Sequence, residues 1–178
     1  MTNETKVVLV DTFDTEIGVM DKNQAHLHGA LHRAISVFIF NSKKEWLLQR
    51  RAENKYHSPG EWTNTCCTHP FPNEDYHQAA LRRLKEEMGI SPEIEEQFRQ
   101  IYKAELDNGM TEHELDAVFI GFSDEIPHPD PLEVAEYRYV KTKDLVADVT
   151  KNPHNYTPWF LKFYPRIEEV IAEKGLNG

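Results

Sequence analysis

The feature that most constrains the fold is a helix whose two ends are both marked in the sequence. Asn73 is a suitable N-cap, and Glu74 and Asp75 place negative charge in the first turn, where the helix dipole favours it. Gly89 can end the helix because glycine readily adopts a left-handed backbone conformation. Apolar side chains recur between these ends at helical spacing, at Ala79, Ala80, Leu81, Leu84 and Met88. This pattern predicts a helix that packs one face on the core.

Runs rich in β-branched and aromatic residues lie on both sides of this helix and predict strands. These runs are residues 7–10, 17–20, 34–40, 46–50, 98–106 and 112–122. Residues 41–44 predict a hairpin turn between two of the strands, and the polar segment 52–60 predicts a loop. Residues 107–109 predict the turn that joins the last two strands.

Two further helices are predicted from their first residues. Residues 91–93 predict a short helix because Pro92 suits the first helical turn. Residues 157–158 open a last amphipathic helix, which Pro165 should kink and Gly175 should end. We find no repeat, low-complexity tract or linker, so residues 1–178 are expected to form one mixed α/β domain.

Composition excludes several classes of protein. The formal net charge of −10 argues against a general nucleic-acid or anionic-membrane surface, since both would repel the chain. The longest uninterrupted apolar run, residues 37–40, is far shorter than the roughly 20 residues that a membrane helix needs. The first residues lack the cationic start and apolar core of a signal peptide, so we expect a cytoplasmic protein. Cys66 and Cys67 are neighbours, and a disulfide between adjacent residues is strained, which favours reduced thiols.

A thiol and an imidazole lie close together before the first helix. Cys67 and His69 are two residues apart, so in an extended segment their side chains point to the same face. Cys66 then points to the opposite face, as a small core residue. A zinc knuckle would need a spaced pair of cysteines and a downstream pair of histidines, and a cysteine protease would need a recognisable oxyanion loop. The sequence offers neither pattern, which disfavours both classes.

Residues 82–90 resemble the second half of the Nudix signature. Its spacing is matched by Glu74, Arg82, Leu84, Glu86, Glu87, Gly89 and Ile90. Thr68 stands where the first glycine of the signature belongs, and Arg83 stands where a metal-binding glutamate belongs. Replacing that carboxylate by a cation weakens the case for a pyrophosphohydrolase, which uses the glutamate cluster to activate water. The plainer alternative is an exposed helix stabilised by salt bridges between residues three or four apart.

Over about residues 18–165 the chain resembles the type I isopentenyl-diphosphate Δ-isomerases, which are Nudix-fold enzymes with a modified signature. The matching positions, in order, include Lys22, His26, His32, Arg51, Lys55, Trp62, Cys67, His69, Arg83, Glu87, Glu112, Glu114 and Trp159. The resemblance implies an α+β sandwich, with a Nudix-like mixed β-sheet flanked by helices. It also implies interconversion of isopentenyl diphosphate and dimethylallyl diphosphate through a tertiary carbocation.

The same resemblance implies a metal site. Its ligands would be His26, His32, His69, Glu112 and Glu114. Three neutral imidazoles and two carboxylates suit an octahedral Mn²⁺ or Mg²⁺ better than Ca²⁺. Glu87 would hold a second Mg²⁺, which bridges this carboxylate and the diphosphate of the substrate.

The residues expected to carry the reaction also follow from the resemblance. We expect Glu114 to act as the acid toward C4 and Cys67 to act at C2, on opposite sides of the substrate. Tyr102 is expected to hydrogen-bond Glu114, and Trp159 to place its π face over the carbocation.

The diphosphate needs a local basic cluster in a chain of negative net charge. The resemblance assigns this contact to Lys22, Arg51 and Lys55, and Arg83 lies close enough on its helix to join them. Arginine offers paired donors and lysine a point charge, so a mixed cluster suits a diphosphate.

Two alternative functions remain at this point: a Nudix-type diphosphate hydrolase and a metal-binding domain without enzymatic activity. The expected partner is a small allylic or homoallylic diphosphate, with neither nucleic acid nor membrane involved. The expected assembly is a monomer or a weak homodimer.

Overall fold

The computed structural model describes residues 5–55, 57–106 and 109–175 of the chain. Its strands are β1 (Lys6–Val10), β2 (Glu16–Asp21), β3 (His32–Phe40), β4 (Trp46–Arg51), β5 (Trp62–Thr63), β6 (Cys66–Thr68), β7 (Ile94–Glu105), β8 (Thr111–Phe122) and β9 (Val134–Val140). Its helices are α1 (Lys22–His28), α2 (Tyr76–Met88), α3 (Thr142–Lys151), the 3₁₀ turn η2 (Pro153–Asn155) and α4 (Pro158–Glu173).

Strand β3 lies at the centre of the sheet, because it pairs with four other strands. Within the described residues, nine strands form one sheet, whose main path has the order β2-β1-β3-β4-β5. β1, β4 and β6 run antiparallel to β3, whereas β8 runs parallel to it and pairs with β7 on its other side. β9 pairs antiparallel with β4. The sheet is therefore mixed, as the family resemblance implies.

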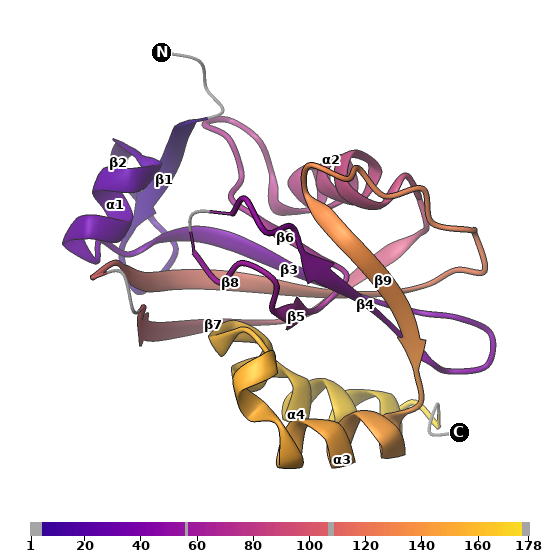
Figure 1. Ribbon diagram of the computed structural model, residues 1–178. Helices are drawn as coiled ribbons and strands as arrows, with labels where there is room; N and C mark the ends of the chain where they lie inside the picture. Colours follow the sequence, from indigo (N-terminus) through magenta and orange to yellow (C-terminus); the bar gives the residue numbers. More distant parts are fainter. Residues whose placement is uncertain (1–4, 56, 107–108, 176–178) are drawn as a thin grey trace.

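Helices cover both faces of this sheet, with α2 on one face and α3 and α4 on the other (Figure 1). Alternate side chains of β3 point to opposite faces. Ile35 packs in one buried cluster with Leu84 of α2, and Phe38 packs in a second cluster with Phe160 of α4. Because both faces of β3 are covered, its sequence is an almost continuous apolar run rather than an alternating one.

The helix predicted from Asn73 starts later than expected, so the predicted N-cap is wrong. Asn73 has a left-handed backbone, with φ of 70°. Asp75 is the N-cap of α2, and its carboxylate accepts a hydrogen bond from the backbone N–H of Gln78. The Gln78 side chain accepts one from the backbone of Asp75 in return, which completes a capping box. Gly89 ends the helix in the left-handed conformation, as predicted.

The short helix predicted at residues 91–93 is also wrong, because this segment leads directly into β7. Ile94 already pairs with Gly121 of β8, and the pairing continues along the whole strand to Glu105. The elements α1, α3, β5, β9 and η2 were not predicted from the sequence. Of the turn predicted at 107–109, residues 107 and 108 lie outside the described residues.

Across the three described segments of the chain, no helix is both long enough and apolar enough to cross a membrane.

Candidate active site

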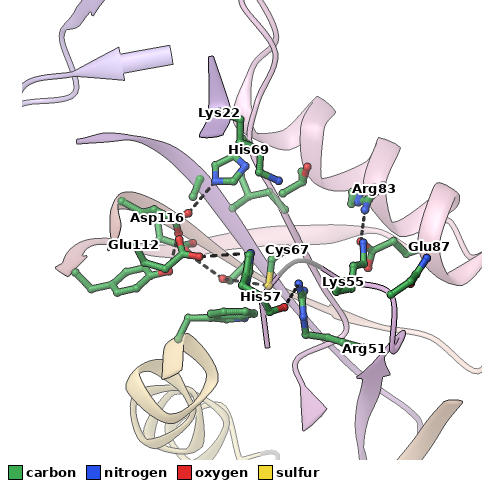
Figure 2. A pocket seen from close by; sticks show the side chains of 18 residues that line it. Lys22, Arg51, Lys55, His57, Cys67, His69, Arg83, Glu87, Glu112 and Asp116 are labelled. Atoms are coloured by element: carbon green, nitrogen blue, oxygen red, sulfur yellow. Dashed lines mark hydrogen bonds and ion pairs between the residues drawn. The ribbon is translucent and has the colours of Figure 1, made fainter. Parts of the chain in front are cut away.

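A cavity of about 200 Å³ opens beside β3, and most elements of the fold contribute to its wall. Figure 2 shows Glu112 and Asp116 on one side of the pocket, Arg83, Lys55 and Glu87 on the other, and Cys67 between them. The lining residues used below are Lys22, Ser36, Arg51, Lys55, His57, Cys67, His69, Arg83, Glu87, Tyr102, Glu112, Glu114, Asp116 and Trp159.

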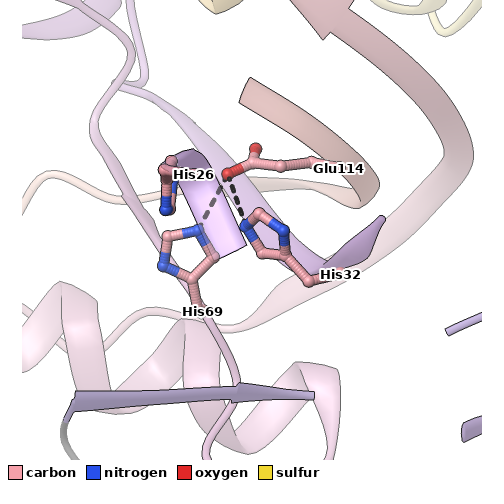
Figure 3. A group of neighbouring side chains, drawn as sticks. All are labelled: His26, His32, His69 and Glu114. Carbon is pink, nitrogen blue, oxygen red and sulfur yellow. Dashed lines mark hydrogen bonds and ion pairs between the residues drawn. The ribbon is translucent and has the colours of Figure 1, made fainter. Parts of the chain in front are cut away.

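Four of the five predicted metal ligands form a tight group, which we call the metal cluster. His26 of α1, His32 of β3, His69 after β6 and Glu114 of β8 place one ligand atom each within 4.8 Å of all the others (Figure 3). His32 and Glu114 are direct partners in the parallel pairing of β3 with β8. The Oε1 atom of Glu114 lies 2.8 Å from Nε2 of His69 and 3.6 Å from Nε2 of His32.

Backbone carbonyls orient two of these imidazoles. Nδ1 of His26 lies 2.6 Å from the carbonyl oxygen of Lys22, and Nδ1 of His32 lies 2.8 Å from that of Ala30. Because a carbonyl only accepts, each Nδ1 carries the hydrogen, and each Nε2 offers a lone pair to the cluster.

The cluster fits a divalent ion. Among the described residues, Nε2 of His26 and Nε2 of His32 are buried and have no hydrogen-bond partner. Buried acceptors of this kind are unfavourable unless something satisfies them. Imidazoles and a carboxylate are suitable ligands for a divalent metal ion, which would do so.

The fifth predicted ligand, Glu112, lies at the edge of the metal cluster. It precedes Glu114 by two residues on β8, so both side chains point to the same face of the sheet. Its Oε2 atom lies 3.4 Å from Nε2 of His26 and, within the described part of the chain, has no hydrogen-bond partner either. Glu112 can therefore complete the ligand set after a small movement of its side chain.

The two cysteines lie on opposite sides of the sheet, as the alternation along the strand predicts. Cys66 is fully buried in the core against α2, and Cys67 lines the pocket. The Cys67 thiol donates to Oδ1 of Asn64 at 3.2 Å, and Oγ of Ser36 lies 4.0 Å away. Burial, together with the nearby charge of Asp116, raises the pKa of the Cys67 thiol.

Tyr102 and Trp159 also take part in the pocket wall. Tyr102 is the cross-strand partner of Glu114, and its hydroxyl donates to Oε2 of that carboxylate at 2.7 Å. Trp159 stands in the first turn of α4 and is almost fully buried. The guanidinium carbon of Arg51 lies 5.2 Å from the centre of its ring, so one aromatic face meets a cation.

The four predicted diphosphate contacts all reach the pocket, and we call them the basic cluster: Lys22, Arg51, Lys55 and Arg83. Burial lowers the pKa of Lys22, which makes its charge sensitive to the neighbouring carboxylates. Nη2 of Arg83 lies 2.6 Å from Oε1 of Glu87 and 2.5 Å from Oε2 of Glu133. Burial raises the pKa of Glu87, and the charge of Arg83 opposes this shift.

Asp116 and His57, which line the pocket, and Glu133, which contacts two of its lining residues, were not found from the sequence. Asp116 follows Glu114 by two residues on β8, so strand alternation alone could have placed it in the pocket. His57 lies in a polar loop with no periodic signal, and burial, followed by the charge of Arg51, lowers its pKa to about 3. Glu133 precedes β9, a strand that the sequence did not reveal.

Comparison with known proteins first defines the class. The NUDIX domain family matches residues 30–164 of this chain. A crystal structure of a Deinococcus radiodurans protein covers 82% of this chain and 89% of its own, with a TM-score of 0.68 and 17% identity. A MutT protein from Methanosarcina mazei covers 78% and 94%, with a TM-score of 0.65 and 23% identity. Similarity at this level establishes a NUDIX fold.

Curated relatives then define the family. An isopentenyl-diphosphate Delta-isomerase of Pectobacterium atrosepticum is 48% identical over 165 residues, which is 93% of this chain and 92% of the relative. Isopentenyl-diphosphate Delta-isomerase 1 of Aromatoleum aromaticum is 51% identical over 169 residues, which is 95% of this chain and 94% of the relative. The chain belongs to the isopentenyl-diphosphate Delta-isomerase family, a family of enzymes, and the resemblance seen in the sequence is confirmed.

Proposed function

We propose that this protein interconverts isopentenyl diphosphate and dimethylallyl diphosphate, which are precursors for isoprenoid biosynthesis. The observation that carries the proposal is the presence of Cys67 and Glu114 in one pocket together with the basic cluster. A group that donates a proton and a group that removes one are the two requirements for moving a double bond. The names of the relatives support the same substrate pair.

Proton transfer at two carbons accounts for the reaction. Glu114, in its carboxylic acid form, donates its proton to C4 and becomes a carboxylate. The π electron pair of the C3=C4 bond forms the new C–H bond at C4 and leaves a tertiary cation at C3. Cys67, as the thiolate, removes a proton from C2, and the electron pair of that C–H bond becomes the C2=C3 double bond. Burial raises the pKa of the Cys67 thiol, so Cys67 rests as the neutral thiol; once its proton has left, the thiolate is a strong base toward carbon. Exchange with solvent then restores both groups.

The remaining walls of the pocket suit a cationic intermediate. Tyr102 donates to Glu114 and so holds this carboxyl in one orientation. Trp159 offers an aromatic face, and such a face stabilises a desolvated cation by about 2 kcal/mol or more. Both residues are almost fully buried, which helps to keep water away from the carbocation.

The metal requirement is part of the proposal. We infer that one Mg²⁺ or Mn²⁺ binds to His26, His32, His69, Glu112 and Glu114, and that Glu87 holds a second Mg²⁺ carried in with the diphosphate. The unsatisfied nitrogen atoms of the metal cluster support the first site. When bound, a divalent ion supplies positive charge that makes a neighbouring carboxyl group more acidic.

Substrate binding is assigned to the basic cluster. Arg51, Lys55 and Arg83 lie on the side of the pocket away from Glu112 and Asp116, and Lys22 lies next to His69 (Figure 2). The ion pair of Arg83 with Glu87 supports an isomerase rather than a Nudix-type diphosphate hydrolase. A hydrolase would use a carboxylate at position 83 to help activate water.

One incubation separates the three candidate functions. The purified protein is mixed with isopentenyl diphosphate and Mg²⁺, and the products are identified by NMR and a phosphate assay. We expect dimethylallyl diphosphate without released phosphate. Free phosphate or pyrophosphate would indicate a hydrolase, and an unchanged substrate would indicate a metal-binding domain without this activity.

Deuterium labelling tests the proposed mechanism. In D₂O, deuterium should appear at C4 of dimethylallyl diphosphate and, after reversal, at C2 of isopentenyl diphosphate, because both proton carriers exchange with solvent. Isomer formed at the normal rate without deuterium would contradict the mechanism, since a direct hydrogen shift needs neither Glu114 nor Cys67.

Three further expectations stay predictions. We infer one domain over residues 1–178, a cytoplasmic location, and a monomer or weak homodimer. The neighbouring reduced cysteines support the location. The net charge of −10 supports a small diphosphate partner rather than nucleic acid or an anionic membrane.

A further inference from the structure

One carboxylate oxygen of Glu133 contacts two residues of the basic cluster. It stands just before β9, and its Oε2 contacts both Nζ of Lys55 and Nη2 of Arg83. The latter distance is 2.5 Å, and the Glu133 side chain is 26% exposed. Lys55 and Arg83 come from a loop after β4 and from α2, so this carboxylate connects parts of the pocket that are distant in sequence.

The backbone of Glu133 strengthens this connection. Its carbonyl oxygen accepts a hydrogen bond from the N–H of Ala52 at 3.0 Å, at the start of the loop that carries Lys55. The next residue, Val134, pairs with Arg51 between β9 and β4. Glu133 is thus fixed to the strand end that holds Arg51 and, through its side chain, to Lys55 and Arg83.

The carboxylate of Glu133 keeps two like charges close together. Two cations that contact the same oxygen lie only about 5 Å apart, and at this distance like charges repel appreciably. A long lysine side chain is free to move away unless an anion holds it. Arg83 is also paired with Glu86 and Glu87, so two cations and three carboxylates meet at one place, and this region carries no excess of positive charge. The affinity of this region for a diphosphate therefore depends on where its donors point rather than on its net charge.

We propose that Glu133 is a positioning residue of the diphosphate site. It holds Lys55 and Arg83 together at the edge of the pocket, so that both cations meet the diphosphate of one substrate molecule. This role rests on the proposed function of the basic cluster, and Glu133 itself takes no part in the proton transfers.

The test is the Glu133→Gln substitution in the full-length, metal-loaded protein. We expect KM for isopentenyl diphosphate to rise about tenfold or more while kcat changes less than threefold, because the amide no longer holds two cations. Glu133→Asp should recover part of the affinity. Glu136→Gln is the matched control, because Glu136 loses the same charge on β9 but contacts Arg50 outside the pocket, 2.9 Å away.

Binding of inorganic pyrophosphate with Mg²⁺, measured by calorimetry, gives a readout that does not need isomerase activity. It should weaken in Glu133→Gln and stay unchanged in Glu136→Gln even if the substrate pair proposed above is wrong. In the Lys55→Ala background, Glu133→Gln should have a smaller effect than in the natural sequence, since one of its two partners is already missing. Unchanged or tighter pyrophosphate binding in Glu133→Gln, or strictly additive effects in the double variant, would overturn the proposal.

Discussion

The two ends of the pocket are built in opposite ways. At the metal cluster, His26 and His32 are fully buried, and within the described residues their Nε2 atoms have no hydrogen-bond partner. At the basic cluster, the side chains of Lys55 and Arg83 are 19% and 20% exposed, and both already contact Glu133. The metal cluster needs a cation to satisfy its buried acceptor atoms. At the basic cluster, neighbouring carboxylates already neutralise the positive charges.

This difference links burial to the expected effect of a substitution. A buried acceptor without a partner lowers stability, so the metal cluster should couple ion binding to folding as well as to chemistry. Ion pairs in partly exposed positions contribute little to stability and exchange partners readily. We therefore expect changes at the metal cluster to affect turnover, ion content and unfolding, and changes at the basic cluster to affect mainly substrate affinity.

The largest effect should come from Glu114→Gln. The amide cannot donate the proton to C4 and is a poor metal ligand, so turnover should fall by about 10⁴-fold or more, beyond the usual effect of one acid–base group. Metal analysis should find about one tightly held ion in the natural protein and less in Glu114→Gln and Glu112→Gln. Glu105→Gln, an exposed change on the neighbouring strand, serves as the control. Normal ion content together with normal turnover in Glu114→Gln would contradict the assignment of Glu114 as a metal ligand and proton donor.

The next largest effect should separate the adjacent cysteines. Cys67→Ala should lower turnover by about 10²–10⁴-fold without unfolding the protein, because it removes a proton carrier from the pocket. Cys66→Ala should instead lower the free energy of unfolding by roughly 0.5–3 kcal/mol, as core substitutions do. Rates normalised to the folded fraction and urea unfolding curves check both statements. Equal losses of rate in the two variants would contradict the assignment by strand alternation.

A smaller effect is expected at the basic cluster. Lys55→Ala and Arg51→Ala should each raise KM for the diphosphate about tenfold and change kcat much less, because the charge they meet is present throughout the reaction. Initial rates over a range of substrate concentrations and ionic strengths provide the measurement. If both variants keep normal affinity at every ionic strength, the diphosphate binds elsewhere.

The last effect concerns thermal stability. A free ion concentration about 100-fold above Kd stabilises a folded protein by about 2.7 kcal/mol, which for a chain of this size is a rise in Tm of roughly 5–10 °C. Differential scanning calorimetry with Mn²⁺ or with a chelator should show this shift, and Glu112→Gln should reduce it. Equal melting temperatures with and without chelator would show that the buried ligands do not couple ion binding to folding.

Much of the site could be predicted from local sequence and family resemblance. Strand alternation places Cys67 in the pocket and Cys66 in the core, and the same rule would have placed Asp116 beside Glu114. Local signals were less reliable at helix ends. Asn73 and Asp75 are both good N-caps, and only the left-handed backbone at Asn73 decides between them.

The other omissions have tertiary causes. α1 has only seven residues and buries Ala25 and His26, so its sequence shows little apolar periodicity. β9 buries mainly Val134, and without that strand Glu133 could not be placed near the pocket. Parallel pairing of β3 with β8, which brings His32 beside Glu114, depends on contacts between distant segments that no short pattern encodes.

That parallel pairing also has a consequence for the order in which the protein assembles. Ser36 and Asp116, which are joined by a 2.8 Å hydrogen bond across the two strands, are 80 residues apart in sequence. The residues of the metal cluster come from four separate segments between α1 and β8, so no local fragment can gather them. We therefore expect the strands to pair before the ion binds. The bound ion should then lower the rate of unfolding rather than raise the rate of folding.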